Sequence, residues 1–302
     1  MGELFNRQCI VQMGTVLVNG LRVQFKIDKH DAAVPSSAEI SVWNLARETR
    51  ARIVAQSELT VMRNNKNFPG GIPVILMAGY GTDLSQLFNG DIMPYGLSIV
   101  RSGPDWLTKF KVGDGMLSYQ TDRVQASVPK GSSIKQIILQ LLKCFHGVDT
   151  KKVFVDIMSG KIPLTGAFQQ LFNAGALSGR AMDEMNRLLA RQGLKCTVVD
   201  GSLEFTPLDP AAKSLAWPAD LIPDLTPRTG LIGSPEAAKD KFIKFRCLLR
   251  PAIKPNRMVR VVWSEHPAGL YIRAQKITHT GDTRGQEWYT DVEGKAVEAQ
   301  AP

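Results

Sequence analysis

Hydrophobic and polar residues alternate along much of the first 120 residues. Val23, Phe25 and Ile27 are apolar, and the residues between them are polar. A period of two is typical of a β-strand that buries one face. Neighbouring strands of this kind predict a β-barrel or a β-sandwich. The expected strands cover residues 21–27, 38–42, 59–63, 74–80, 86–98 and 106–114, and Asn44 is expected to cap a short helix at 45–55.

The pattern changes to a helical period after about residue 128. Between residues 134 and 145 the apolar residues recur every three or four positions, which predicts an amphipathic helix capped by Ser132 or Ser133. A short strand is expected at 153–155 and a second helix at 180–191. A hairpin at 194–199 and 203–206 would turn at Asp200-Gly201. Together these elements predict a small α+β domain.

The last third begins with a proline-rich stretch. Six of the 17 prolines lie between residues 207 and 235, which predicts an extended connector. Strands are expected again at 242–249, 258–263, 270–277 and 286–292. The fold class that follows is mainly β with an α+β insert.

Composition supports a folded chain of ordinary kind. The 302 residues are 44% hydrophobic and 22% charged, which excludes wholesale disorder and collagen-like repeats, and the length suggests about two domains. The formal net charge is +9, with the excess spread over all three segments. A basic chain raises the question of nucleic-acid binding, which depends on how the charges are arranged.

One basic run is dense, between residues 239 and 260, where Asp240 is the single acidic residue. Part of it alternates with apolar residues, as in a strand with one basic face. Such a face could bind phosphates, or it could be solvated or contact an acidic partner. No aromatic residues interleave it as single-strand binders require, so we favour the second interpretation. The candidate contact residues are Lys244, Arg246, Arg250, Lys254, Arg257 and Arg260, with Lys239 and Lys241 in the same run.

No targeting or redox signal stands out. The first residues lack a basic segment followed by an apolar one, so we expect no secretory signal, and no apolar run is long enough for a membrane span. Cys9, Cys144, Cys196 and Cys247 lie far apart. Disulfide frameworks and zinc sites need paired spacing, so we interpret the cysteines as reduced core residues.

Candidate catalytic groups are few. Ser132 and Lys135 fit a Ser-x-x-Lys pattern, but the accompanying motifs are missing and a helix cap is the better interpretation. His266 follows Glu265, and His279 lies three residues before Asp282. Either histidine could hold a metal or act as a base, although both lie in turn-like sequence. We therefore expect no enzyme, no metal and no cofactor.

Short motifs follow one another along nearly the whole chain. They lie at residues 20–25, 38–45, 48–53, 88–92, 103–106 and 113–115, and later at 225–235, 247–251, 279–282 and 287–289. Their distinctive residues are Trp43, Asp105, Trp106, Asp114, Gly230, Gly233, Pro235, His279, Gly281, Asp282 and Trp288. In this order the motifs resemble the baseplate hub proteins of contractile-tailed bacteriophages, and also the hub module of type VI secretion spikes.

The resemblance implies a structural protein of the virion tail baseplate, assembled in the host cytoplasm. Two tail-tube-like β-barrels, at residues 1–125 and 208–302, would flank the small α+β domain at 126–207. Three chains would form a homotrimeric ring that adapts the sixfold tail tube to the threefold spike. The implied partners are the spike below, the tail tube or its initiator above and baseplate wedge proteins, with DNA only in transit and no membrane insertion. The distinctive residues would be structural.

Two other functions stay open from the residues alone. The chain could be a cell-wall-degrading tail hydrolase that uses His266 or His279, or, third in rank, a basic nucleic-acid-binding module. A hub must let DNA pass without gripping it, because a basic channel would bind phosphates. We therefore expect the basic groups of residues 239–260 to face neighbouring proteins and not the channel.

Overall fold

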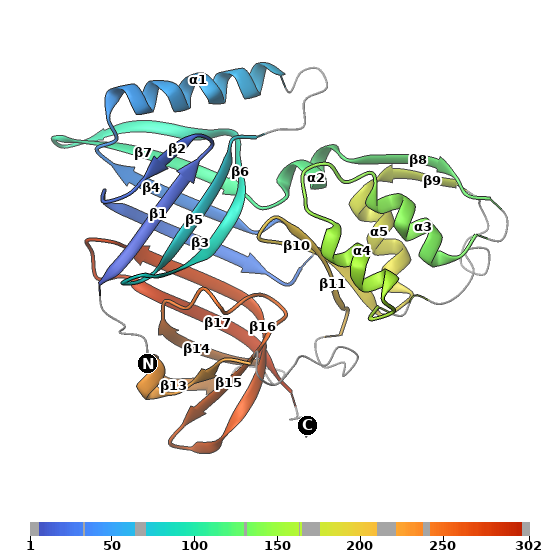
Figure 1. Ribbon diagram of the computed structural model, residues 1–302. Coiled ribbons are helices and arrows are strands. Elements are labelled where there is room, and N and C mark those ends of the chain that lie inside the picture. The colour runs from blue at the N-terminus through green and yellow to red at the C-terminus, as the bar shows by residue number, and fades with distance from the viewer. Residues whose placement is uncertain are drawn as a thin grey trace.

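The structure is a computed structural model that describes residues 6–32, 34–63, 71–129, 132–162, 164, 176–209, 222–237 and 242–297, without the side chains of 57–63 and 117. Most of the elements are strands, and a 13-stranded sheet runs through both ends of the chain (Figure 1). The fold class is therefore mainly β with an α+β insert, as the sequence predicts.

Three hydrophobic cores divide the chain into what we call the first β part, the mixed part and the second β part. The first β part contains β1 (Arg7–Met13), β2 (Val16–Val18), β3 (Val23–His30), β4 (Ser37–Trp43), α1 (Arg47–Arg63), β5 (Pro73–Tyr80), β6 (Asp83–Ser102) and β7 (Asp105–Gly113). The mixed part contains α2 (Met116–Thr121), β8 (Arg123–Ser127), α3 (Ile134–Leu142), α4 (Lys151–Met158), β9 (Ala176–Arg180), α5 (Ala181–Ala190), β10 (Leu194–Val199) and β11 (Ser202–Pro207). The second β part contains β12 (Asp224–Leu225), the 3₁₀ turn η3 (Pro227–Thr229), β13 (Leu231–Ala237), β14 (Phe242–Leu248), β15 (Met258–Trp263), β16 (His266–Asp282) and β17 (Trp288–Val297).

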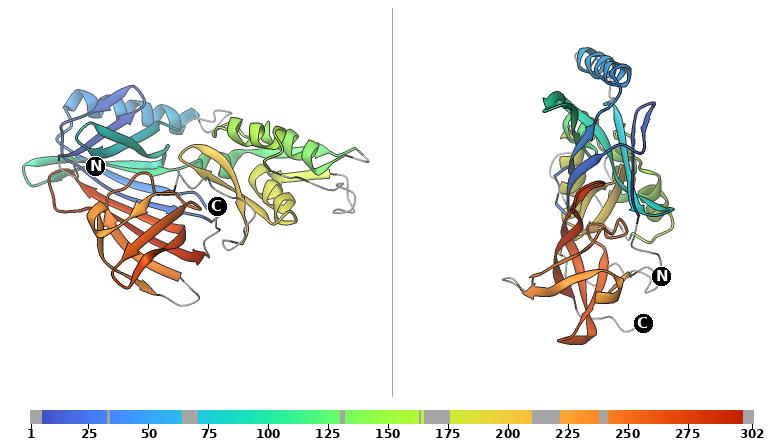
Figure 2. Two further views of the ribbon diagram at one scale, coloured as in Figure 1. Left: turned by 60° about the horizontal axis from the view of Figure 1, so that its bottom comes forward. Right: turned by 90° about the vertical axis from the view of Figure 1, so that its left-hand side faces the viewer.

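The two β parts share one sheet although they lie far apart in sequence. Its strand order is β13-β14-β17-β16-β3-β4-β7-β6-β5-β1-β2, with β15 beside β16 and β12 beside β15. β16 pairs with β3 from Lys276 opposite His30 to Asp282 opposite Gln24. β1 and β5 lie in front of β3 and β4 in Figure 1 and beside them in the right-hand view of Figure 2, so they form a second layer, and α1 lies above the two. The alternation in β3 arises because Val23, Phe25 and Ile27 point into the space between these layers.

Two helix assignments correct the sequence prediction. α1 continues to Arg63, so the strand expected at 59–63 is wrong and the helix is longer than the predicted 45–55. The strand expected at 153–155 is wrong as well, because that segment lies inside α4. Val153 and Ile157, four residues apart, bury one face of α4. A short apolar run does not distinguish a strand from a buried helix, so local pattern alone could not decide.

Other local predictions are confirmed. Ser133 caps α3 through a capping box with Gln136. Ser132, the serine of the Ser-x-x-Lys match, donates instead to the Pro129 carbonyl at 2.9 Å. β10 and β11 form the expected hairpin around Asp200 and Gly201. The proline-rich stretch is only partly an extended connector, since β12, η3 and β13 lie within it and Pro227 begins η3; residues 210–221 lie outside the described part.

The cysteines are free, and Cys9, Cys196 and Cys247 are buried, as expected of core residues, whereas Cys144 is half-buried. Burial raises the pKa of the Cys9 thiol to about 12. None of the helices in the described ranges is long and apolar enough to cross a bilayer.

Candidate functional site

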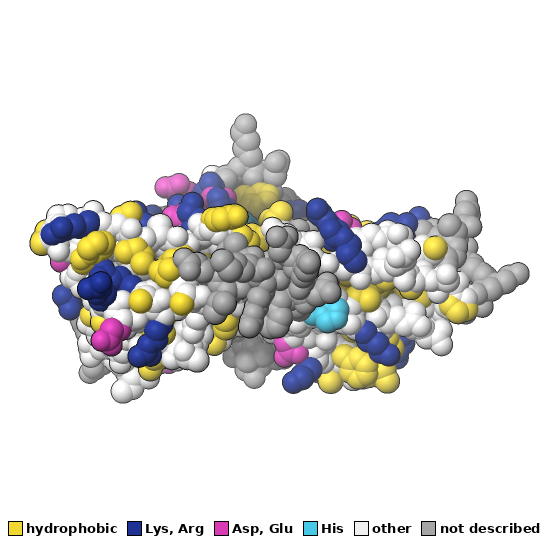
Figure 3. Space-filling model, turned by 90° about the horizontal axis from the view of Figure 1, so that it is seen from above, with side chains coloured by type: hydrophobic (Ala, Val, Ile, Leu, Met, Phe, Trp, Pro, Cys, Tyr) yellow, Lys and Arg dark blue, Asp and Glu magenta, His cyan; other side chains and the backbone are white. Residues whose placement is uncertain are grey.

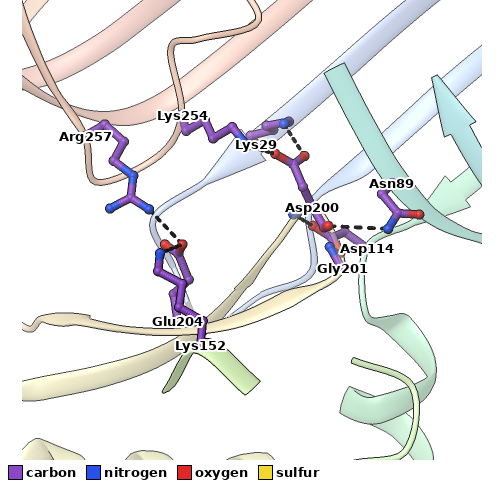
Figure 4. A network of polar contacts seen from close by, with 9 residues as sticks. All are labelled: Lys29, Asn89, Asp114, Lys152, Asp200, Gly201, Glu204, Lys254 and Arg257. Atoms are coloured by element: carbon purple, nitrogen blue, oxygen red, sulfur yellow. Dashed lines mark hydrogen bonds and ion pairs between the residues drawn. The ribbon is translucent and has the colours of Figure 1, made fainter. Parts of the chain in front are cut away.

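The three parts of the chain meet around Asp200, at the tip of the β10–β11 hairpin (Figure 4). Asp200 and Gly201 both have positive φ, 53° and 81°, as a tight two-residue hairpin turn requires. The Asp200 carboxylate lies 2.5 Å from Lys29 Nζ of β3 and 2.9 Å from Lys254 Nζ of the second β part. One hairpin tip of the mixed part therefore carries charge pairs to both β parts. We call this cluster, together with Asp114, the ionic junction.

Asp114 holds the same turn from the end of β7. Its carboxylate accepts the backbone N–H of Asp200 at 2.6 Å and that of Gly201 at 2.8 Å. Asn89 donates to the Asp200 carbonyl at 3.4 Å (Figure 4). A Cβ at Gly201 would lie 2.5 Å from the Asn89 amide, so glycine fits this turn for space as well as for its backbone.

The two carboxylates of the ionic junction have opposite pKa shifts. Burial, with a smaller contribution from Asp200, raises the pKa of Asp114 to about 7 despite its two backbone donors. Burial also opposes ionisation of Asp200, but Lys29 and Lys254 outweigh it and lower the pKa of Asp200 below its ordinary value. The junction thus holds one firmly ionised acid and one that titrates near neutral pH.

A second set of ion pairs lies beside the ionic junction. Glu204 on β11 binds Arg257 at 2.7 Å and Lys152 of α4 at 2.9 Å (Figure 4). On β10, the other strand of the hairpin, Lys195 pairs with the buried Asp31 at 2.9 Å. Lys254 and Arg257, two of the predicted contact residues, are therefore turned toward acids of the mixed part.

The other predicted contact residues also have partners within the chain. On β14, Lys244 lies 3.0 Å from Glu293 and Arg246 forms two hydrogen bonds with Asp291, each residue directly opposite its partner on β17. Arg260 lies 3.1 Å from Asp224. Arg250 donates to the Thr229 carbonyl at 2.6 Å. Lys239 and Lys241 lie outside the described residues.

Opposite charges also face one another farther along the sheet. Lys26 on β3 is opposite Glu39 on β4, which is opposite Lys111 on β7. Asp28 accepts a hydrogen bond from Thr278 across the strand pair that links the β parts. On the face seen from above, Lys and Arg are scattered among other residues and not gathered in one patch (Figure 3). On this face, the described residues form no uninterrupted basic strip that could bind phosphates (Figure 3).

Several distinctive residues of the motifs pack where β3 meets β16, a contact that we call the strand seam. Trp288 is fully buried and meets Phe25 edge to face, with ring centroids 5.5 Å apart. Gly281 lies opposite Phe25, and a Cβ there would come within 2.3 Å of the Phe25 ring. The absence of a side chain at position 281 therefore lets the Phe25 ring pack directly against the backbone of β16. Both β parts are joined here by shape and by backbone hydrogen bonds.

A polar member of the motifs fixes one end of the strand seam. Asp282 binds the Arg22 guanidinium at 2.7 and 3.2 Å and accepts the N–H of Arg284. Burial opposes ionisation of Asp282, but Arg22 outweighs it and lowers the pKa of Asp282. The Arg22 guanidinium also lies over the ring of Trp43, 4.5 Å from its centroid.

His279 is also part of the strand seam and is fully buried, with Nδ1 2.9 Å from Thr290 Oγ1. Burial, and then the charge of Lys29, lowers the pKa of His279 to about 3. The imidazole is therefore neutral at physiological pH and closed to solvent. His266 is exposed instead, at 4.5 Å from the Trp263 ring. Within the described ranges no three His, Cys, Asp or Glu side chains are grouped as a metal site would need.

The remaining motif residues shape turns away from the seam. Asn44, at positive φ, donates to Asp105 at 2.8 Å and accepts the N–H of Trp106 at 3.0 Å, which ties β4 to the start of β7. Gly230 and Gly233 have positive φ, 109° and 70°, on either side of the first residues of β13. Pro235 lies in the irregular stretch where the β13–β14 register shifts. The motif residues therefore lie partly in the strand seam and partly in turns of the two β parts.

Sequence reasoning missed the buried charges of the ionic junction. Along β3 every second side chain points into the core, and Lys29 and Asp31 follow Val23, Phe25 and Ile27 at this spacing. A charged residue at a position where an apolar one is expected is therefore the sequence signal of a buried charge. The sequence pattern around Asp200 indicates only a turn. Its partner Lys29 is 171 positions away in sequence, which no local pattern can reveal.

Comparisons with known proteins give a fold and no sequence family. No protein-family model matches the chain. No curated protein matches its sequence.

Solved structures do match over nearly the whole chain. A prophage MuSo2 43 kDa tail protein from Shewanella oneidensis has a TM-score of 0.59 at 9% identity, covering 96% of this chain and 97% of that one. A tail protein from Neisseria meningitidis MC58 has a TM-score of 0.56 at 11% identity, with the same coverage. The Escherichia coli c3393 protein, a type VI secretion component described as similar in structure to the T4 tail proteins gp27 and gp5, has a TM-score of 0.51 at 11% identity and is covered over 76% of its length. The chain therefore has the fold of phage tail proteins, which is also present in a type VI secretion component.

Proposed function

We propose that this protein is a baseplate hub of a phage contractile tail, and that three copies form a ring between the sixfold tail tube and the threefold spike. The observation that carries the proposal is the full-length match to two phage tail proteins, 96% of this chain against 97% of each. A match of this kind includes both β parts and the mixed part, in the same order.

The internal arrangement supports the same function. Each chain supplies two β parts held side by side in one sheet. Three such chains would present six β units around an axis, which is the number that a sixfold tube requires. The strand seam and the ionic junction hold the three parts of one chain together, as a component that transmits load between tube and spike needs. The boundaries that we propose for the domains are 1–125, 126–207 and 208–302.

The partners follow from this position. We propose the spike protein below the ring, the tail tube or its initiator above it and baseplate wedge proteins around it. DNA would pass only in transit, and the protein would take no part in a membrane. The virion tail baseplate would be its location, after assembly in the host cytoplasm.

The role we propose is structural and not catalytic. His279, one of the two histidines of the hydrolase alternative, is fully buried and its pKa is lowered to about 3. We retain the proposal that Lys244, Arg246, Arg250, Lys254, Arg257 and Arg260 belong to a surface for neighbouring proteins. Because most of them already pair with acids of this chain, their contacts with neighbours would be shared ion pairs and hydrogen bonds.

Electron microscopy of assembled tails tests the function. The chain is tagged at its C-terminus, tails are purified through the tag, and the averaged image is examined at the tube–spike boundary. A hub predicts density on the tail axis with threefold symmetry and three tags per particle. Tag density off the axis, or six copies in the tube itself, would contradict the proposal.

A further inference from the structure

The mixed part is joined to the β parts differently from the way in which the β parts are joined to each other. The core of the first β part includes Leu249 and Trp288 of the second, and the two parts share one sheet through β3 and β16. Among the described residues, the buried core of the mixed part lies wholly between 124 and 205, and its two small sheets pair with neither β part. The mixed part is therefore a separate folded body at the side of the β parts (Figure 2).

One hairpin of the mixed part, β10–β11, carries ion pairs across this boundary to both β parts (Figure 4). The pairs are Asp200 with Lys29 and Lys254, Lys195 with Asp31, and Glu204 with Arg257. Asp114 adds the hydrogen bonds that it accepts from the backbone of the turn. Charge and hydrogen bonding at one hairpin therefore do for the mixed part what apolar packing does for the two β parts.

The charges of this contact are buried. Lys29 is 1% exposed and Asp200 is 8% exposed, and removing such charges from water offsets much of their attraction, so a buried ion pair is often no more stabilising than an apolar contact of the same size. Burial also raises the pKa of Asp31, and that of Asp114 to about 7. Asp31 Oδ1 is buried and accepts no hydrogen bond from the described residues. The hairpin contact is therefore held less firmly than the strand seam.

The chain enters the mixed part through Gly115. Asp114 belongs to the β side, because its backbone N–H donates to the Ser36 carbonyl at 2.9 Å. Gly115 follows with a φ of 61°, and α2 begins directly after it. Glycine has no Cβ to restrict its backbone, and residues of this kind at the ends of elements absorb the rotations of domains. Gly115 is therefore a position about which the mixed part can rotate.

We propose that the mixed part swings as one body on Gly115, and that the β10–β11 hairpin is the latch that holds it against the β parts. In the open state Asp200 leaves Lys29 and Lys254, and Asp114 releases the N–H groups of the turn. The strand seam takes no part, because both of its strands belong to the β parts. All three cores stay folded while the surfaces that face one another across the boundary become exposed. The inference concerns a single chain and does not depend on the proposed ring.

Distances between spin labels within one chain test the motion. Labelled chains are diluted into unlabelled ones, and Cys144→Ser removes the half-buried native thiol. Labels are placed on exposed positions that become cysteine. Lys143 with Ser98 spans the mixed part and the first β part, Lys143 with Arg187 lies within the mixed part, and Ser98 with Lys244 spans the two β parts.

Asp200→Asn is the variant that should open the latch. Asparagine tolerates the positive φ of this turn, so the substitution removes the charge and keeps the backbone. The distance distribution of Lys143 with Ser98 should gain a second population, while the other two label pairs keep their wild-type distributions. Asp83→Asn, which removes an exposed carboxylate of the first β part, is the control and should change none of the three.

Hydrogen exchange measures how often the latch opens in the wild type. The N–H groups of Asp200 and Gly201 donate across the boundary, so they exchange whenever the latch opens. They should exchange at least about tenfold faster than the core amides of β3 and α5, which need unfolding of their own part. A Cβ at Gly201 would lie 4.0 Å from the Asn89 Cβ, within the range of a disulfide, so Asn89→Cys with Gly201→Cys can lock the latch. Oxidation of this variant should slow exchange at Asp200, and reduction of the same sample should restore it.

The outcomes separate the latch from the proposed function. Exchange of Asp200 and Gly201 at the rate of the β3 core would overturn the latch, because the contact would then open only on unfolding. An unchanged distribution of Lys143 with Ser98 in Asp200→Asn would overturn it too, and so would second populations in all three label pairs, since the parts would not move as bodies. Native mass decides the hub independently, because a trimer with a closed latch supports the hub alone and a monomer with an opening latch supports the latch alone.

Discussion

The strand seam and the ionic junction both join parts of this chain, but they do so by different physical means. At the strand seam, backbone pairing between β3 and β16 is sealed by the buried ring pair of Phe25 and Trp288. At the ionic junction, a hairpin tip is held by two lysines and the Asp114 carboxylate. The seam depends mainly on shape and apolar burial, although the buried His279 and the Arg22–Asp282 pair also titrate there. The junction depends on charge, so substitution of a single charge should affect it most.

The largest expected effect is at the strand seam. Trp288→Ala removes a fully buried indole and should lower the free energy of unfolding by about 3–5 kcal/mol, measured by urea denaturation. Trp106→Ala is the matched control, since Trp106 is 41% exposed, and it should cost about 1 kcal/mol or less. Equal losses for the two tryptophans would contradict a seam built on apolar packing.

The ionic junction should respond nearly as strongly to the loss of one charge. Lys29→Met leaves the buried Asp200 with Lys254 alone and should lower the free energy of unfolding by about 3 kcal/mol. Adding Asp200→Asn should recover part of that loss, because the uncompensated carboxylate is then gone. Lys26→Met, on the exposed face of the same strand, should change stability by less than about 0.5 kcal/mol. Without recovery in the double variant, Lys29 would act through packing and not through charge.

A smaller effect should appear in the pH dependence of stability. The folded-state pKa of Asp114, about 7, lies above its ordinary value, so between about pH 4 and 7 the folded chain binds more protons there than the unfolded chain. This residue therefore makes stability fall as pH rises through that window. Relative to wild type, Asp114→Asn should gain about 1–2 kcal/mol on going from pH 5 to pH 7.

Thermal or urea unfolding at several pH values measures this difference. Asp83 is an exposed residue at the start of β6, so Asp83→Asn is the control, and its plot of stability against pH should follow that of the wild type. The buried His279 contributes in the opposite sense, since a lowered pKa makes stability rise with pH, which is why the difference between two variants is the quantity to compare. Parallel curves for wild type and Asp114→Asn would show that Asp114 is ionised throughout.

The smallest effect is expected on the sheet surface, away from both contacts. Arg246 and Asp291 pair across exposed strands, and a double-mutant cycle should give a coupling energy of about 0.2–1 kcal/mol.

The same ion pair can be used to test DNA binding. Asp291→Lys removes the acid that Arg246 faces and should increase salt-sensitive binding to arbitrary duplex DNA, whereas the wild type should bind weakly at 0.15 M salt. Tight binding by the wild type would contradict a surface whose charges are balanced.

The two contacts also differ in how far the sequence could predict them. Alternation along β3 and β16, the Ser133 cap and the Asp200-Gly201 turn are local, so period and capping rules predict them. Motif order also indicated the residues of the strand seam, including Gly281 and Trp288, although not that they pack on Phe25.

The ionic junction could not be predicted, because it forms only when residues 29, 114, 200 and 254 meet in space. Local pattern failed for a related reason at α4 and at the end of α1. Short runs of β-branched and apolar residues fit a strand and a buried helix equally well, and packing decides between them. The Lys244–Glu293 and Arg246–Asp291 pairs need the register of β14 against β17, which no single strand contains.

The most direct test of the proposed hub is the native mass of the purified full-length chain, at micromolar concentration and moderate salt. A trimeric hub predicts one dominant species of three chains, three times the 33.2 kDa of one chain. A single-chain species across the whole concentration series, or an even-numbered assembly, would contradict it.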